Sequence, residues 1–325
     1  LVMYFLVSNQ GNLETILPMV SVYALAGFKL LPAFQQIYFS IATIQANIAS
    51  YENIQADLKA SAMDDVQDIQ GSLEDNTLEK IKFLHAIQLS NISFAYPGAP
   101  QNLLSNLTIT FPKNQVIGLV GPSGSGKSTL IDILMGLVEP NAGELKIDEQ
   151  ILRASQKRLL QDKIGFVSQT IFLADSSIKE NIGFGIPSSE IIDERVLQAI
   201  RLAHLEDVIS SLPNGIDTFV GERGVQLSGG QRQRIGIARA LYNDPEILVF
   251  DEATSSLDGL TEKLIMEAVN SFSGKKTIIL IAHRLSTVKS CNLIYFIENG
   301  KIADQGTYQH LLESNTSFKK MSETT

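Results

Sequence analysis

Hydrophobic residues gather in two runs at the beginning of the chain. The first run covers residues 1–7 and the second covers residues 16–34, with a short polar turn around Gly11 between them. The second run is close to the roughly 20 residues that an α-helix needs to cross a bilayer. It contains Pro18, Pro32 and Lys29, a cation that is costly in lipid. The pattern favours a membrane-spanning helix, and the alternative is a buried helix of a soluble protein.

After residue 34 the pattern changes to that of an amphipathic helix. The apolar side chains of one helical stripe are separated by Gln, Asn and Ser; they are Ile37, Ile41, Ile44, Ile48, Tyr51 and Leu58. The same helix is therefore predicted to leave the membrane and to pack on partner helices. Residues 56–82 are acidic and polar, which is typical of a solvated linker. We expect residues 1–58 to be the C-terminal part of a transmembrane domain and residues 59–82 to be a linker.

From residue 83 onward, short β-rich runs alternate with helical patterns. The runs are residues 87–94, 107–111, 116–120, 164–167, 247–250, 277–281 and 293–297. Strands that alternate with helices predict a largely parallel core sheet. We therefore expect a second, α/β domain over residues 83–325.

Composition narrows the classes of function. The formal net charge is −9, which disfavours a nucleic-acid partner because phosphate binding needs a basic surface. The one cysteine, Cys291, allows no internal disulfide and no cysteine-built metal site, and its apolar surroundings predict a buried structural thiol. The chain begins with Leu1 and shows no signal-peptide pattern, so we expect it to be a fragment that lacks its N-terminal part.

A glycine-rich loop follows the predicted strand of residues 116–120. Its residues fit the pattern G-x-x-x-x-G-K-[ST]; they are Gly121, Pro122, Ser123, Gly124, Ser125, Gly126, Lys127, Ser128 and Thr129. Glycines let backbone N–H groups turn toward phosphate oxygens, and the helix predicted over residues 128–137 directs its positive end at them. We expect Lys127 to reach the β- and γ-phosphates of ATP and Ser128 to bind Mg²⁺.

Two adjacent acids end the predicted strand of residues 247–250. Asp251 is placed to hold Mg²⁺ through water, and Glu252 is placed to polarise the attacking water. Adjacent acids at a strand end are common, so this motif indicates ATP hydrolysis only together with the glycine-rich loop.

A third motif lies between the first two and identifies a family. Residues 227–231 read Leu-Ser-Gly-Gly-Gln and precede a strongly helical stretch. With the other motifs, this segment resembles the signature of ABC ATPases, and the resemblance covers residue 83 to the C-terminus. It implies an α/β P-loop NTPase fold with a RecA-like core, an antiparallel β subdomain and a helical signature subdomain. A transmembrane helical segment would precede that fold.

The resemblance assigns further roles by position. Tyr96 matches the aromatic residue that stacks on adenine, and Gln169 matches the glutamine that senses Mg²⁺ and the γ-phosphate. Asp258 matches the D-loop aspartate, and His283 matches the histidine that contacts the γ-phosphate. The implied catalytic residues are thus Glu252, His283 and Gln169, and the implied metal ligands are Ser128, Gln169 and Asp251. The implied nucleotide-binding residues are Tyr96, the glycine-rich loop, Asp258, Ser228, Gly229, Gly230 and Gln231.

Two segments resemble exporters in particular. Residues 221–224 resemble the X-loop of ABC exporters, and residues 177–182 resemble the exporter segment that follows the Q-loop, the loop that carries Gln169. A helix on the same chain as the ATPase is typical of exporter half-transporters, which favours membrane spanning by residues 16–34. The resemblance implies a head-to-tail dimer with a second copy or a homologous half-transporter. It also implies a multi-pass protein of the inner (plasma) membrane, with a cytoplasmic ATPase, lipid contacts and no nucleic acid.

The substrate stays open in the sequence. Residues 17–32 resemble the last membrane helix of bacterial flippases for lipid-linked oligosaccharides, while lipid A, peptides and drugs are alternatives. Lys29 would either contact a phosphate-bearing lipid or extend to the headgroups. Soluble ABC ATPases of DNA repair and ABC ribosome factors are less favoured, because the N-terminus is apolar and only one ATPase cassette is present.

Overall fold

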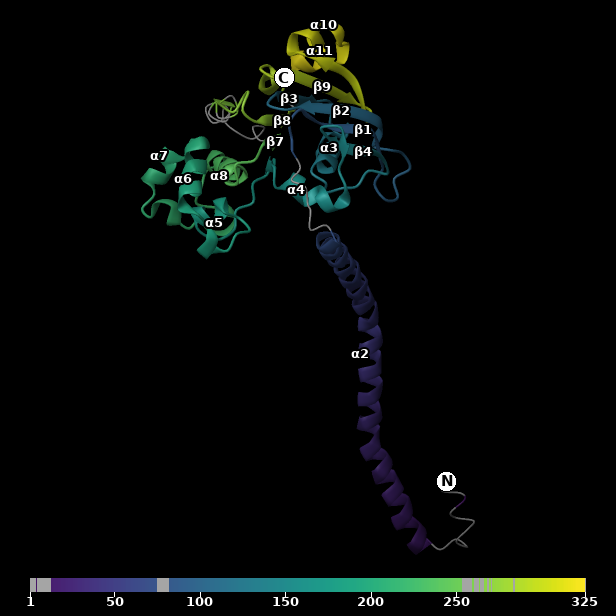
Figure 1. Ribbon diagram of the computed structural model, residues 1–325. Coiled ribbons are helices and arrows are strands. Elements are labelled where there is room, and N and C mark those ends of the chain that lie inside the picture. The colour runs from purple at the N-terminus through teal and green to yellow at the C-terminus, as the bar shows by residue number, and fades with distance from the viewer. Residues whose placement is uncertain are drawn as a thin grey trace. The chain divides into compact units, whose positions relative to one another are not determined.

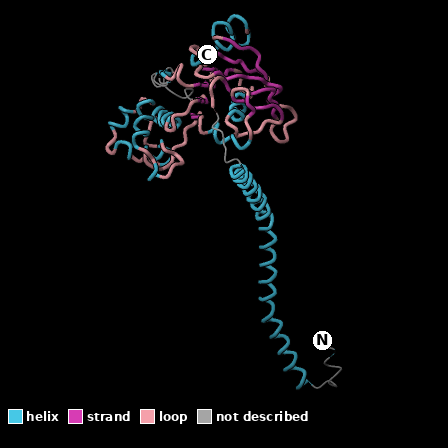
Figure 2. Tube along the Cα trace, viewed as in Figure 1, coloured by secondary structure: helices cyan, strands magenta, loops and turns pink. Residues whose placement is uncertain are grey.

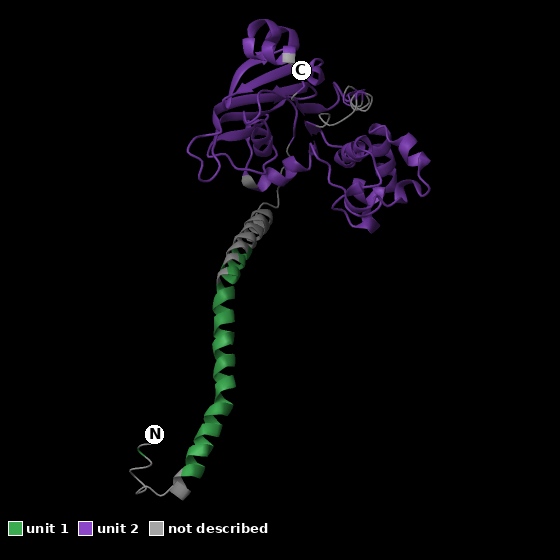
Figure 3. Cartoon of the chain, turned by 180° about the vertical axis from the view of Figure 1, so that it is seen from behind, with its two compact units in different colours: residues 1–76 green, residues 77–325 purple. Residues whose placement is uncertain are grey.

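The computed structural model divides the chain into two compact units, Leu1–Asn76 and Thr77–Thr325 (Figure 3). The residues that it describes are 4, 13–74, 82–252, 259, 263, 266, 267, 269, 271–282 and 284–324. Each unit is described by itself below.

Nearly all described residues of the first unit belong to helix α2 (Leu13–Glu74), of 62 residues (Figure 1). Its segment Leu17–Glu52 is apolar and long enough to cross a membrane. None of the residues in the most hydrophobic stretch of this segment is buried. Pro18 and Pro32 lie inside the helix. The helix continues through the predicted amphipathic stretch and through much of the predicted linker, to Glu74. Residues 59–74 contain no proline, and half of them are strong helix formers, which permits this continuation.

The second unit contains two sheets (Figure 2). The larger has six strands in the order β10-β9-β3-β8-β7-β6, and only the β9–β10 pair is antiparallel. Its strands are β3 (Val116–Val120), β6 (Ile164–Val167), β7 (Ile247–Asp251), β8 (Thr277–Ile281), β9 (Leu293–Glu298) and β10 (Lys301–Gly306). This sheet is the parallel core that the sequence predicts.

The smaller sheet is antiparallel, with the order β2-β1-β4-β5. Its strands are β1 (Ala86–Phe94), β2 (Leu104–Pro112), β4 (Ala142–Ile147) and β5 (Gln150–Ile151). The hydrophobic pattern missed β4, β5 and β10. These strands are short or carry many exposed side chains, so they lack the apolar runs that mark the other strands.

Helices α5 to α8 form a lobe to one side of the strands (Figure 1). The α-helices of this unit whose bounds fall within the described residues are α3 (Lys127–Leu134), α4 (Lys157–Gln161), α5 (Ile178–Ile182), α6 (Asp193–Leu202), α7 (Glu206–Ser211), α8 (Gly229–Leu241), α10 (Tyr308–Ser314) and α11 (Thr316–Thr324). Short 3₁₀ helices cover Ala154–Gln156, Ser188–Glu190, Gly215–Asp217, Glu222–Gly224 and Leu285–Val288.

The strands of the larger sheet divide their side chains between two hydrophobic clusters. In β7, Leu248 and Phe250 join the cluster that includes the helical lobe, while Ile247 and Val249 join the cluster that includes the antiparallel sheet. Successive strand residues point to opposite faces, so both faces of the sheet are buried. Cys291 belongs to the first cluster, and burial raises the pKa of its thiol to about 12. The predicted buried thiol is confirmed.

Gly165 in β6 lets helix α8 pack closely against the sheet. A Cβ atom on Gly165 would lie 2.5 Å from the carbonyl oxygen of Ala240 and 2.8 Å from Cγ of Pro245. Ala240 belongs to α8 and Pro245 to the turn before β7, so a side chain at position 165 would have to displace the helix or the turn.

We expect Gly165→Ala to lower the free energy of unfolding by about 1–3 kcal/mol, because it overpacks this contact. Thermal unfolding followed by circular dichroism should show a midpoint lower by several degrees. Gly229→Ala is the matched control, because a Cβ atom there meets nothing within 4 Å. Equal midpoints for the two variants would contradict this account of Gly165.

Candidate nucleotide-binding site

The glycine-rich loop runs from the end of β3 to the start of α3 (Figure 1). Gly124 and Gly126 have positive φ angles of 76° and 98°, which favour glycine. A Cβ atom on Gly121 would lie 2.0 Å from the carbonyl oxygen of Ile297, and one on Gly126 would lie 2.5 Å from Cδ2 of Leu104. The backbone of the loop therefore requires glycine at these positions, both for its conformation and for its close contacts.

Lys127 lies inside this loop with 5% of its surface exposed. Its ammonium donates to the carbonyl oxygens of Gly121 and Pro122, at 2.9 Å each. Burial lowers the pKa of the Lys127 ammonium, and the nearby carboxylates of Glu252 and Asp251 act in the opposite direction. The carbonyl oxygens of Gly121 and Pro122 thus hold the Lys127 ammonium inside the loop.

A pocket brings the loop together with the end of β7. Its lining residues are Leu103, Ser123, Gly124, Gly126, Lys127, Ser128, Thr129 and Glu252. The hydroxyl of Ser125 is buried in the loop without a hydrogen-bond partner. A buried hydroxyl without a partner and a lysine ammonium are groups that phosphate oxygens can satisfy. The residues present therefore fit a polyphosphate.

The acidic residues occupy the carboxyl end of β7. Asp251 is its last residue, and Glu252 follows with a positive φ angle of 47°. The described residues include no group of three or more His, Cys, Asp or Glu that could hold a metal ion. Mg²⁺ commonly uses one or two protein ligands together with phosphate oxygens and water. Ser128 and Asp251 fit that limited role.

Gln169 contacts Glu252 directly. The Nε2 atom of Gln169 donates to Oε2 of Glu252 at 2.7 Å, although the two residues lie far apart in the sequence. The contact forms because β6 and β7 are parallel neighbours, so the segments after them leave the sheet at the same edge. Two of the predicted catalytic residues are therefore brought together.

Tyr96 lies beyond the end of β1, with 48% of its surface exposed. Its hydroxyl is 3.1 Å from Oγ1 of Thr129, and its ring meets Phe94 edge to face at 4.9 Å between centroids. These two contacts hold the ring beside the glycine-rich loop, and its stacking on adenine stays a prediction. Leu103 in the pocket lining was missed by sequence reasoning, since one leucine before a strand carries no distinctive signal.

The signature residues lie elsewhere in the unit, at the start of α8. Ser228 caps the helix: its hydroxyl accepts from the backbone N–H of Gln231 at 3.2 Å, and Oε1 of Gln231 accepts from the N–H of Ser228 at 2.8 Å. This reciprocal pair is a capping box. Ser228, Gly229, Gly230 and Gln231 are not among the residues that line the pocket. Predicted residues Asp258 and His283 lie outside the described residues.

Sequence reasoning also missed a polar network that joins α8 to the segment after Gln169. Arg239 donates to the carbonyl oxygens of Asn181, at 2.8 Å, and Phe172, at 3.0 Å. Asn181 is fully buried and bonds to Ala174 through both its amide nitrogen and its oxygen. Burial lowers the pKa of the Arg239 guanidinium. The network fixes the path of the chain between the Q-loop and the signature helix.

Comparison with known proteins agrees with this geometry. A model of the ABC transporter family matches residues 104–255. The chain is 41% identical over 251 residues to "ATP-binding cassette sub-family B member 10, mitochondrial" of Mus musculus, covering 76% of this chain and 35% of the relative. It is 46% identical over 233 residues to "Leukotoxin translocation ATP-binding protein LktB" of a Pasteurella haemolytica-like species, covering 71% of this chain and 32% of that protein.

A solved structure supports the same relationship. "Structure of a bacterial Atm1-family ABC exporter with ATP bound" matches with a TM-score of 0.70 and 34% identity, covering 75% of this chain and 42% of that one. The chain thus spans less than half the length of each of these relatives. The part of the chain that follows the long helix is an ABC transporter ATP-binding domain, which binds and hydrolyses ATP and is homologous to those of exporter-type half-transporters.

Proposed function

We propose that this protein works as an exporter-type ABC half-transporter, in which ATP binding and hydrolysis drive a substrate across a membrane. One observation carries the proposal: a helix that is long and apolar enough to cross a membrane stands on the same chain as the ATP-binding domain. Homology to exporter-type relatives supports it. Placement in the inner (plasma) membrane with a cytoplasmic ATPase is part of this proposal.

The residues that line the pocket, together with Ser125, Asp251 and Gln169 beside them in the sequence or by contact, suggest how the hydrolytic step proceeds. The loop amides, Lys127 and the Ser125 hydroxyl would bind the phosphates, and Ser128 and Asp251 would hold Mg²⁺ together with Gln169. Bound Mg²⁺ would neutralise charge that develops on the phosphate oxygens. Glu252 would orient the attacking water and accept its proton. One oxygen of Glu252 accepts from Gln169, so this hydrogen bond would have to break for Gln169 to help hold the metal.

The site would be completed by a second copy of the chain or by a homologous half-transporter. The signature residues do not line the pocket of their own chain, and they stand at the N-terminus of a 13-residue helix. Such a terminus favours a negatively charged ligand. In a head-to-tail dimer, Ser228 and Gly230 of one copy would face the γ-phosphate bound by the other. ATP would stabilise the closed dimer, and hydrolysis would release it.

The proposed substrate is a lipid-linked oligosaccharide or another phosphate-bearing lipid. The resemblance of residues 17–32 to flippases supports this class, and Lys29 supplies an exposed cation within the apolar helix. A peptide or protein substrate is the second candidate, because a relative at 46% identity is named for leukotoxin translocation.

Glu252→Gln tests the catalytic assignment. We expect turnover at saturating MgATP to fall by about 10²–10⁴-fold, because the amide cannot accept the proton of water. Affinity for a fluorescent ATP analogue should persist, since the side chain keeps its size. Glu246→Gln is the matched control, because it makes the same change just before the opposite end of β7. Near-normal phosphate release by Glu252→Gln would refute the assignment.

A mixing experiment tests the composite site. Ser228→Arg and Lys127→Ala should each abolish ATPase activity, because each removes one half of both sites in a homodimer. Random pairing of the two variants should restore about a quarter of wild-type activity, since half of the dimers regain one of two sites. Differently tagged copies allow heterodimers to be purified. Purified heterodimers as inactive as either parent would exclude the head-to-tail arrangement.

Lys29→Ala tests the substrate class. In proteoliposomes, we expect slower flipping of a fluorescent polyprenyl-pyrophosphate sugar while basal ATPase activity is retained, because only the cation for the headgroup is lost. Lys29→Arg should preserve flipping. Lys59→Ala is the control, because Lys59 is also exposed on α2 but lies outside Leu17–Glu52. Normal flipping by Lys29→Ala would favour the alternative in which Lys29 extends to the headgroups.

A further inference from the structure

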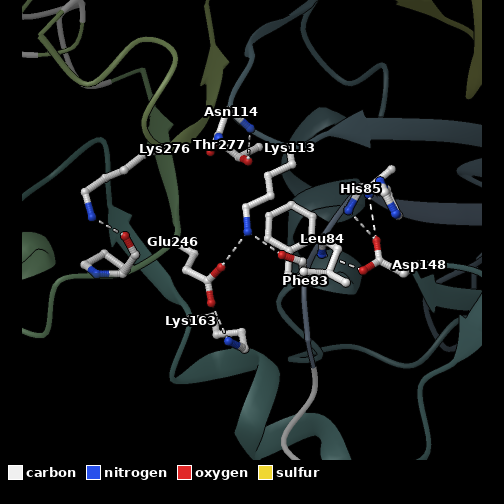
Figure 4. Close-up of polar contacts among 12 residues, drawn as sticks. Phe83, Leu84, His85, Lys113, Asn114, Asp148, Lys163, Glu246, Lys276 and Thr277 are labelled. Carbon is white, nitrogen blue, oxygen red and sulfur yellow. Dashed lines mark hydrogen bonds and ion pairs between the residues drawn. The ribbon is translucent and has the colours of Figure 1, made fainter.

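The chain joins the ATPase unit through residues 83–86, which we call the junction segment. Its backbone is held by Asp148, in the turn between β4 and β5. The carboxylate of Asp148 accepts from the backbone N–H groups of Leu84 at 2.5 Å, His85 at 2.7 Å and Ala86 at 2.9 Å (Figure 4). Burial acts to raise the pKa of the Asp148 carboxyl, but these three amides prevail and lower it. An ionised side chain thus holds three consecutive amides.

Lys113 holds the same segment through different atoms. Its ammonium donates to the carbonyl oxygen of Phe83 and lies 5.1 Å from the centroid of the Phe83 ring (Figure 4). The Phe83 side chain is only 2% exposed. The backbone N–H of Lys113 also donates to the carbonyl oxygen of His85 at 2.7 Å. The junction segment is therefore fixed on one side by Asp148 and on the other by Lys113.

Lys113 connects the junction segment to the catalytic strand. Its ammonium lies 3.2 Å from Oε2 of Glu246, the residue immediately before β7, and Lys163 donates to the other oxygen of Glu246 (Figure 4). Burial acts to raise the pKa of the Glu246 carboxyl, but Lys163 and Lys113 prevail and lower it. The far end of β7, about 20 Å away at 3.3 Å per residue, carries Asp251 and Glu252.

These contacts share one edge of the sheet. Lys163, Glu246 and Lys276 each directly precede a parallel strand, and Lys113 lies three positions before β3. Lys276 also binds the turn before β7, through Oδ1 of Asp244 at 2.6 Å and the carbonyl oxygen of Pro245 at 2.5 Å. The nucleotide pocket lies at the opposite, carboxyl edge of these strands. One strand, β7, thus joins the catalytic carboxylates to the place where the chain enters the unit.

We propose that the junction segment is a rigid attachment, in which Lys113 and Asp148 act as positioning residues that hold its backbone on the ATPase unit. Displacement of the sheet on ATP binding is then passed along the chain toward α2, in addition to any transmission through the Q-loop. A loosely attached junction would absorb that displacement. The inference rests on the proposed function, because it requires α2 to respond to ATP.

The test uses the full chain, reconstituted in lipid nanodiscs, with Lys113→Met and Asp148→Asn as independent variants. Ser50→Cys, at an exposed position of α2 outside the apolar stripe that is predicted to pack on partner helices, accepts an environment-sensitive fluorophore, and the buried thiol of Cys291 does not compete for it. The response of the fluorophore to ATP and vanadate reports on α2. Hydrogen exchange of residues 84–86 reports on the attachment, and phosphate release reports on the ATPase site.

In both variants we expect exchange of the junction amides to be about 10-fold faster, because charge-assisted hydrogen bonds are lost or weakened. The fluorophore response should fall to less than about half, with basal ATPase activity within about twofold of wild type. Lys163→Met is the matched control: it breaks the other ion pair of Glu246 without touching the junction, so the response should persist. Lys113→Arg should restore the response.

Two results would overturn the inference alone. The first is a full fluorophore response in variants whose junction amides exchange faster. The second is a parallel loss of response and ATPase activity, which would mean that the attachment serves only stability. Absence of any ATP response in the wild-type protein would instead overturn the proposed function, and the inference with it.

Discussion

A parallel sheet that is buried on both faces determines where chemistry can occur in this protein. The side chains of β3, β7 and β8 are apolar in both directions, because each face is covered by a hydrophobic cluster. Polar groups can therefore gather only where the strands end. The glycine-rich loop follows β3, Asp251 ends β7 and is followed by Glu252, and Gln169 lies two residues after β6. The antiparallel sheet and the helical lobe add Tyr96 and the signature helix to this frame.

The polar groups of the pocket already bind one another. Lys127 donates to two carbonyl oxygens of its own loop, and Gln169 donates to Glu252. The phosphates of ATP therefore have to compete with these internal contacts when they bind. Because Gln169 and the Arg239 network belong to connected segments, a change at the pocket is placed to alter the lobe that carries the signature. Nucleotide can shift the population of two conformations only if it binds one of them more tightly than the other.

The two edges of the sheet have different roles. The carboxyl edge offers backbone N–H groups, Lys127 and carboxylates to a ligand, so its polar groups are arranged around a pocket. At the amino edge, Lys113, Lys163 and Glu246 satisfy one another and hold the chain where it enters the unit. β7 extends from one edge to the other. One end of this strand therefore carries the predicted catalytic carboxylates, and its other end lies next to the segment through which the chain enters the unit.

The sequence by itself determined the features that depend on local backbone. The glycine-rich loop and the alternating strands of the core were predicted correctly, because glycine conformations and burial on two faces leave a pattern in consecutive residues. Only the tertiary structure decided which distant residues meet: Gln169 with Glu252, Leu103 with the loop, Lys113 with Glu246, and Asp148 with residues 84–86. Such contacts depend on strand order and on the turns between strands. A lysine or an aspartate in a loop carries no local signal of the partner that folding will bring to it.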